Sequence, residues 1–131
     1  MVEIVQIGRE QLFDLQEATK LLPTMQKITK KFYDENHQIE NRLQRLVMAD
    51  PRRRQYLEEF KVNVTQWKLR MEGLGVKASN LWKVQLDVGE GYLCWQYPEL
   101  VISHFLPYQE DWKNRIKLSD YIEQTDPDWA C

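Results

Sequence analysis

Cys94 and His104 are the residues whose types best fit covalent chemistry, because a thiolate nucleophile needs a base within hydrogen-bonding distance. Both lie in a stretch that alternates apolar and polar residues, as strands do. The register that pairs Leu93 with His104 places the cysteine and the histidine on opposite faces of a sheet. We therefore predict a packing cysteine, a histidine at the edge of the core and no catalytic residue.

Metal ligation is not predicted either. The chain has two histidines, His37 and His104, and no HxxxH, HExxH or CxxC spacing. His37 is followed by Glu40 at a helical step, which is typical of a solvated pair on a helix surface. We expect no metal and no cofactor.

A small-ligand, metal-binding or enzymatic site is the alternative at the end of the predicted sheet. Its candidate residues are Trp95, Glu99, His104 and Arg115. They combine an aromatic surface, a carboxylate, an imidazole and a guanidinium where the sheet is expected to meet the helices. The sequence leaves open whether the protein is an enzyme.

A basic cluster is predicted where two helices reverse direction, and it is a candidate site for an anionic polymer. Its members are Arg42, Arg45, Arg52, Arg53 and Arg54. Three arginines in the first turn of a helix oppose its dipole, which hints at an anionic partner. No aromatic residue interleaves with them, so nucleic-acid binding is not expected.

The helices that position these residues have clear start and stop signals. Asp14 and Glu17 match a capping box, and the apolar pattern then continues to about Met48, with Pro23 either kinking the helix or starting a second one. Asp50-Pro51 predicts the next start, with aspartate as the cap. Gly73 and Gly75 predict the stop.

The second helix has an apolar seam with spacings of three and four residues, as in a coiled coil. The seam consists of Leu57, Phe60, Val64, Trp67, Met71 and Leu74. A short connection forces the two helices antiparallel, so residues 11–74 are predicted to form a helical hairpin. This seam and the surplus aromatic residues Phe32, Tyr33, Trp67 and Trp82 favour a homodimer.

The segment 84–106 is predicted to be a three-stranded antiparallel meander. Gly89-Glu90 fits a two-residue hairpin loop, which pairs Leu86 with Leu93 and Val84 with Trp95. An even-length turn at Pro98-Glu99 then pairs Trp95 with Ile102. The expected fold is α+β, with the hairpin packed on the meander.

Length and composition predict a single domain covering residues 1–131. The net charge is -2, with two cysteines and no long apolar run, so we expect a cytoplasmic protein without a membrane span or signal peptide. Residues 2–7 could form an edge strand or an apolar arm. Residues 119–131 form an acidic tail.

Three blocks of sequence resemble a known family. They are FDLQEATKLLP at 13–23, GLGVK at 73–77 and YLCW at 92–95. In order and spacing they resemble the prokaryotic family catalogued as domain of unknown function 2203 (DUF2203), over residues 12–118. The resemblance implies a long helical pair followed by strands, with Glu99 and Arg115 at the places of a glutamate and a late arginine. It implies no established activity, so we predict a non-enzymatic interaction or structural module.

The chain departs from the family pattern at several positions. Gln16 stands where the first glutamate is usual, and Pro98 stands where the turn usually has glycine. Phe105-Leu106 replace the usual Trp-His pair, with His104 nearby. A family site built on that histidine would therefore have a different geometry in this protein.

Overall fold

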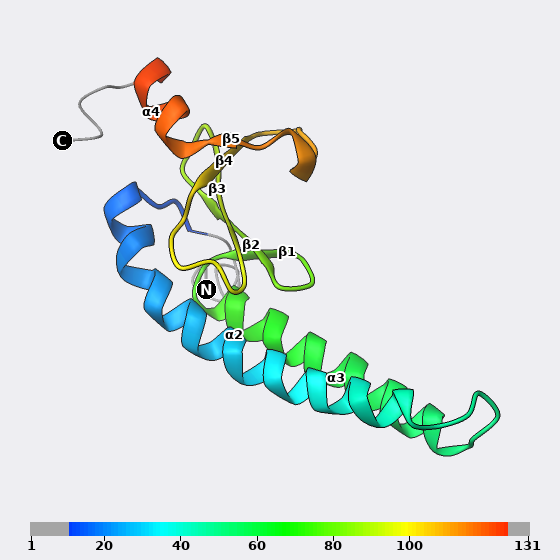
Figure 1. The fold of residues 1–131 in the computed structure, drawn as a ribbon. Helices are drawn as coiled ribbons and strands as arrows, with labels where there is room; N and C mark the ends of the chain where they lie inside the picture. Colours follow the sequence, from blue (N-terminus) through cyan, green and yellow to red (C-terminus); the bar gives the residue numbers. More distant parts are fainter. Residues whose placement is uncertain (1–10, 126–131) are drawn as a thin grey trace, which may run out of the picture.

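The computed structural model describes residues 11–125, and Figure 1 shows a long helical hairpin with a sheet against one end of it. The elements are α2 (Leu15–Gln44), α3 (Arg52–Gly73), β1 (Lys77–Asn80), β2 (Lys83–Asp87), β3 (Gly91–Gln96), β4 (His104–Pro107), η1 (Trp112–Asn114), β5 (Ile116–Lys117) and α4 (Leu118–Thr125). The predicted α+β class is confirmed. The segment 2–7 and the end of the acidic tail, 126–131, lie outside the described residues.

Helix α2 begins at the predicted capping box. Asp14 Oδ1 accepts a hydrogen bond from Glu17 N at 2.7 Å, and Glu17 Oε1 accepts one from Asp14 N at 2.9 Å. Two amides at the helix start are thereby satisfied. The helix continues through Pro23, so the alternative of a second helix there is wrong, and it ends at Gln44, earlier than expected.

Helix α3 begins at Arg52, one residue later than predicted, with Pro51 at the cap position. Asp50 still accepts a hydrogen bond from Arg52 N, at 2.9 Å. The other end is a Schellman motif, in which Val76 N donates to Met71 O at 3.3 Å. This motif needs a left-handed residue, and Gly75 has a φ of +88°.

The buried stripe of α3 differs from the predicted seam. Its buried residues are Asn63, Trp67 and Met71, whereas Leu57 is 46% exposed. The predicted seam therefore holds only toward the end of the helix that faces the sheet. On α2 the buried residues recur at steps of three and four, and they are Ala18, Leu22, Met25, Thr29, Phe32, Asn36 and Ile39.

The sheet is an antiparallel meander of five strands in the order β1-β2-β3-β4-β5, so the prediction of three strands is wrong. Strand β1 lies between the predicted hairpin, residues 11–74, and the predicted meander, residues 84–106, and its pairing with β2 shifts between Ala78 and Asn80. Strand β5 has only two residues. Neither strand is long enough to show a clear alternation of apolar residues.

The predicted register of β2 on β3 is confirmed, with Val84 opposite Trp95 and Leu86 opposite Leu93. Gly89 has the positive φ, +93°, that the first position of a type II′ turn requires.

The predicted register of β3 on β4 is wrong by one residue: Leu93 faces Phe105, and Cys94 faces His104. The cause is the connection 97–103, which is longer than a tight turn. Glu99 holds this connection, because its carboxylate accepts from Gln96 N at 2.8 Å. The shift exchanges the two faces of β4, so Phe105 is buried in the core and His104 turns outward.

The core lies between the hairpin and the inner face of the sheet. Val84, Leu86, Leu93 and Trp95 on that face are fully buried. Helix α4 adds Tyr121, whose ring stacks on Phe105 with centroids 3.7 Å apart.

An aromatic cluster marks the place where the hairpin leaves the sheet. Trp82 packs edge-on against Trp67 at 5.0 Å and against Tyr33 at 5.6 Å, and Tyr97 lies 4.9 Å from Tyr33. Phe32 and Trp67 are buried. The aromatic residues that were taken as surplus for a dimer are therefore used inside the molecule. Beyond this cluster the hairpin runs away from the sheet (Figure 1).

Candidate functional site

The corrected register gathers polar residues on the outer face of the sheet, the face turned away from the hairpin. One row of paired residues crosses all five strands, and it consists of Lys77, Gln85, Cys94, His104 and Lys117. Cys94 and His104 are therefore direct neighbours on one face. The prediction that they lie on opposite faces of the sheet is wrong.

Burial nevertheless prevents Cys94 from acting as a nucleophile. The side chain is fully buried, and this burial raises the pKa of the thiol to about 12. The nearby Arg115 guanidinium lowers this pKa and the Glu99 carboxylate raises it, both by less than the burial. A thiol with so high a pKa keeps its proton at neutral pH. The His104 ring, in turn, has its Nδ1 2.9 Å from Ser103 Oγ.

The four predicted ligand residues do not form one group. Trp95 lies on the inner face, in the core, and its Nε1 donates to Glu99 O at 2.8 Å. The Glu99 carboxylate is hydrogen-bonded to the backbone of β3, so its evident role is to hold the connection 97–103. Only His104, Arg115 and Glu99 remain near Cys94.

The segment 108–115 lies over the outer face through contacts that sequence reasoning missed. Tyr108 donates a hydrogen bond to Asp87, which raises the pKa of Tyr108 to about 12, and its ring packs edge-on against Tyr92. The Trp112 ring has the Arg115 guanidinium 4.6 Å away and Lys83 Nζ 5.1 Å away. The first of these cation–π contacts holds Arg115, whose Nε also donates to Trp112 O at 3.0 Å.

Gln85 is the polar residue of this face that lacks a full set of partners. The residue is 7% exposed, and its Oε1 accepts no hydrogen bond from residues 11–125. Nothing in its sequence context distinguishes it from the other strand glutamine, Gln96. A buried acceptor without a donor is costly, so a water or a ligand group with a donor would be favoured here.

Several arginines of the predicted basic cluster, at the turn between α2 and α3, make contacts within the chain. Arg52 pairs with Asp50 at 2.7 Å, and this hydrogen bond lowers the pKa of Asp50 to about 2. Arg53 donates to Leu43 O at 2.9 Å, so it satisfies a carbonyl at the end of α2. Arg42 lies over the ring of Tyr56 at 6.0 Å. Of the three arginines in the first turn of α3, Arg52 and Arg53 therefore have partners within the chain.

We call residues 37–62 the arm and the rest of the described chain the body. Within residues 37–62, Ile39 is the only buried residue. Four apolar side chains of the arm are exposed, namely Val47 (72%), Met48 (84%), Leu57 (46%) and Val62 (46%). Two of them, Met48 and Leu57, line the same groove near the turn between the helices.

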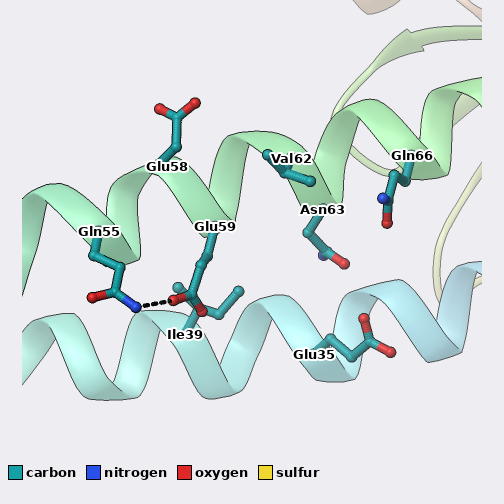
Figure 2. Close-up of a pocket in the computed structure, with 8 residues that line it drawn as sticks. All are labelled: Glu35, Ile39, Gln55, Glu58, Glu59, Val62, Asn63 and Gln66. Atoms are coloured by element: carbon teal, nitrogen blue, oxygen red, sulfur yellow. Dashed lines mark hydrogen bonds between the residues drawn. The ribbon is translucent and has the colours of Figure 1, made fainter.

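Two grooves lie along the arm. The middle groove, about 390 Å³, runs between the helices and is lined by Glu35, Ile39, Gln55, Glu58, Glu59, Val62, Asn63 and Gln66 (Figure 2). In it Gln55 donates to Glu59 at 3.2 Å, while Glu58 points outward. The tip groove, about 730 Å³, is lined by Met48, Asp50, Pro51, Arg53, Arg54, Leu57, Glu58 and Lys61.

The comparison with known families supports the resemblance found in the sequence. The model of the family described as "Uncharacterized conserved protein (DUF2203)" matches residues 11–118, which is most of the chain. The protein belongs to the DUF2203 family. No curated protein and no solved structure matches it.

No helix between residues 11 and 125 is long and apolar enough to cross a membrane. The same residues contain no group of three or more histidine, cysteine, aspartate or glutamate side chains placed to hold a metal ion.

Proposed function

We propose that this DUF2203 protein is a non-enzymatic interaction module that acts as a homodimer through its arm. The observation that carries the proposal is the uncovered end of the hairpin. The sheet covers the part of the hairpin that contains Trp67 and Met71, whereas the arm extends beyond it with Val47, Met48, Leu57 and Val62 exposed.

The energetics of a lone helix pair support an additional partner. Two helices with a single buried apolar residue gain little from burial, because stabilisation scales with the apolar area removed from water. A second arm would cover the exposed side chains and supply that burial. Homodimers with a twofold axis are also the commonest oligomers.

The sheet, by contrast, offers little for catalysis. Its one described thiol is buried and has a raised pKa, and the Glu99 carboxylate is bonded to the backbone of β3. This supports an interaction role over an enzymatic one.

The test is the mass of the protein in solution, measured by light scattering after size exclusion. Wild-type protein should have twice the monomer mass, and Met48→Glu with Leu57→Glu should be monomeric, because the charges would be buried in the interface. Leu100→Glu is the matched control: Leu100 is 83% exposed, but it lies on the body. A wild-type monomer, or a dimer disrupted only by Leu100→Glu, would contradict the proposal.

A small-ligand site on the outer face is the second candidate, and Gln85 favours it. Its unpaired Oε1 lies in the row that contains Cys94 and His104, and Arg115 is close to the thiol. The test is a thermal-shift screen of small carboxylates and phosphates. We expect the melting temperature to shift by no more than a degree or two. A large shift that Arg115→Gln and His104→Ala each abolish would show that ligand binding on the outer face is the function.

A further inference from the structure

The two grooves of the arm have opposite charge and adjoin on one side of it. The middle groove contains Glu35, Glu58 and Glu59 and no basic residue. The tip groove contains Arg53, Arg54 and Lys61. Glu58 lines both grooves, so they form one continuous surface that changes sign along the arm.

Most of these charges have no salt-bridge partner among the residues that the structure describes. The two salt bridges found among residues 11–125 are Lys30–Asp34 and Arg52–Asp50. The second of them uses the one acid of the tip groove other than Glu58. Glu35, Glu58, Arg54 and Lys61 therefore have no ionic partner among the described residues.

We propose that two copies of this chain pair their arms antiparallel, with the tip groove of each copy on the middle groove of the other. This rests on the proposed homodimer and specifies its interface. A twofold axis across α3 at the level of Tyr56 exchanges position 54 with position 58 and position 53 with position 59, so Arg54 and Arg53 of one copy lie against Glu58 and Glu59 of the second. The displacement from position 54 to position 58 is about 6 Å at ~1.5 Å per residue.

The apolar side chains of the arm fit the same arrangement. Leu57 lies near the axis and meets Leu57 of the second copy. Met48 projects from the tip and is carried to the region of Val62, which lines the acidic groove. A methionine side chain is flexible enough to fill an irregular groove of this kind.

The opposite arrangement is disfavoured by charge. Two arms in parallel would place glutamates on glutamates and arginines on arginines, and like charges facing each other across an interface are destabilising. The charge pattern therefore selects the antiparallel pair and also excludes register shifts that superimpose equal charges.

Two charge-reversed proteins test the arrangement by sedimentation or light scattering. In the acid-reversed protein, Glu58→Lys and Glu59→Lys make both grooves basic; in the base-reversed protein, Arg54→Glu and Lys61→Glu make both acidic. Each alone should dimerise at least tenfold more weakly than the wild type. An equal mixture should form a heterodimer of nearly wild-type affinity, because each tip again meets a groove of opposite charge.

The control is Glu40→Lys with Glu90→Lys, which makes the same change in net charge at exposed positions outside both grooves. It should dimerise as the wild type does, and circular dichroism should show all variants folded. A wild-type dimer that neither reversal weakens, or a mixture that does not recover, would overturn the antiparallel pairing and leave the homodimer intact. A wild-type monomer would instead overturn the proposed function.

Discussion

The two ends of the hairpin have the same secondary structure but opposite environments. In the body, Met25, Trp67 and Met71 are fully buried under the sheet. In the arm, the same two helices bury Ile39 and leave Leu57 and Val62 exposed. The periodic spacing of apolar residues thus determines which side of a helix faces its neighbour, but the sheet determines how much of that side is removed from water.

The boundary between the two ends is a layer of polar residues inside the helix pair. Asn63 Nδ2 donates to Asn36 Oδ1 at 2.8 Å and to Phe32 O at 2.9 Å. Trp67 Nε1 donates to Thr29 Oγ1 at 2.9 Å. These bonds align α2 and α3 at the point where apolar packing under the sheet gives way to the arm.

The largest expected difference between body and arm is in thiol reactivity. In a Cys131→Ser background, Cys94 should react with iodoacetamide about a thousandfold more slowly than an unhindered thiol, because its pKa is raised to about 12 and it is fully buried. The matched comparison is Glu40→Cys with Cys94→Ser, which places the thiol at an exposed position of the arm outside both grooves. Equal rates in the two proteins would show that the outer face is open.

Truncating a side chain of the body should lower the free energy of unfolding more than truncating a side chain of the arm. Trp67→Ala should lower the free energy of unfolding by about 3–5 kcal/mol, because it leaves a cavity and an unpaired Thr29 hydroxyl. Leu57→Ala should cost less than about 1 kcal/mol in the monomer, since that side chain is half-exposed. Urea unfolding measures both, at a concentration below dimer formation; similar losses would contradict the contrast drawn between body and arm.

In the polar layer, removing one asparagine should destabilise the protein more than replacing both asparagines together. Asn63→Ala should cost about 1–3 kcal/mol, because Phe32 O and Asn36 Oδ1 lose their donor while remaining buried. Asn36→Leu with Asn63→Leu should cost less than the single change, because both amides are replaced together. Urea unfolding again decides: a double variant less stable than Asn63→Ala would show that the layer stabilises the hairpin as well as aligning it.

The smallest expected effect is the pH dependence of the stability of the hairpin tip around Asp50. The hydrogen bond from Arg52 lowers the pKa of Asp50 from an ordinary 3.8 to about 2. The ionised carboxylate therefore stabilises the folded tip above pH 4, and this contribution disappears as the pH falls toward 2. Asp50 is screened by solvent, so the change should be small; an NMR titration measures its pKa directly, with Arg52→Gln as the control that should restore an ordinary value.

Local signals predicted the helices well. The capping box of Asp14 and Glu17, the turn at Asp50-Pro51 and the loop at Gly89-Glu90 each depend on a few neighbouring residues, and each appears in the structure within one residue. The end of α2 was predicted less well, because Arg53, beyond the turn, supplies donors for its last carbonyls.

The register of β4 could not be predicted in the same way, because it depends on a connection of several residues held by Glu99 contacts. The hydrophobicity of Phe105 was the signal that could have corrected it, since a phenylalanine is favoured over a histidine in the core. The candidate site changed with this register: Cys94 and His104 came together, whereas Trp95 was removed from the group. Gln85 had no sequence signal, because a glutamine in a strand is ordinarily exposed.

The spacing of the buried residues on α2 determines in what steps the length of the hairpin can change. From Ala18 to Ile39 they repeat with a period of seven residues, and the sheet contacts end near Tyr33. Removing seven residues from each helix within the arm would shorten the protein by about 10 Å at ~1.5 Å per residue and keep the same sides facing each other. Arm length can therefore vary in whole heptads without any change in the body, and two arms of unequal length would no longer match end to end.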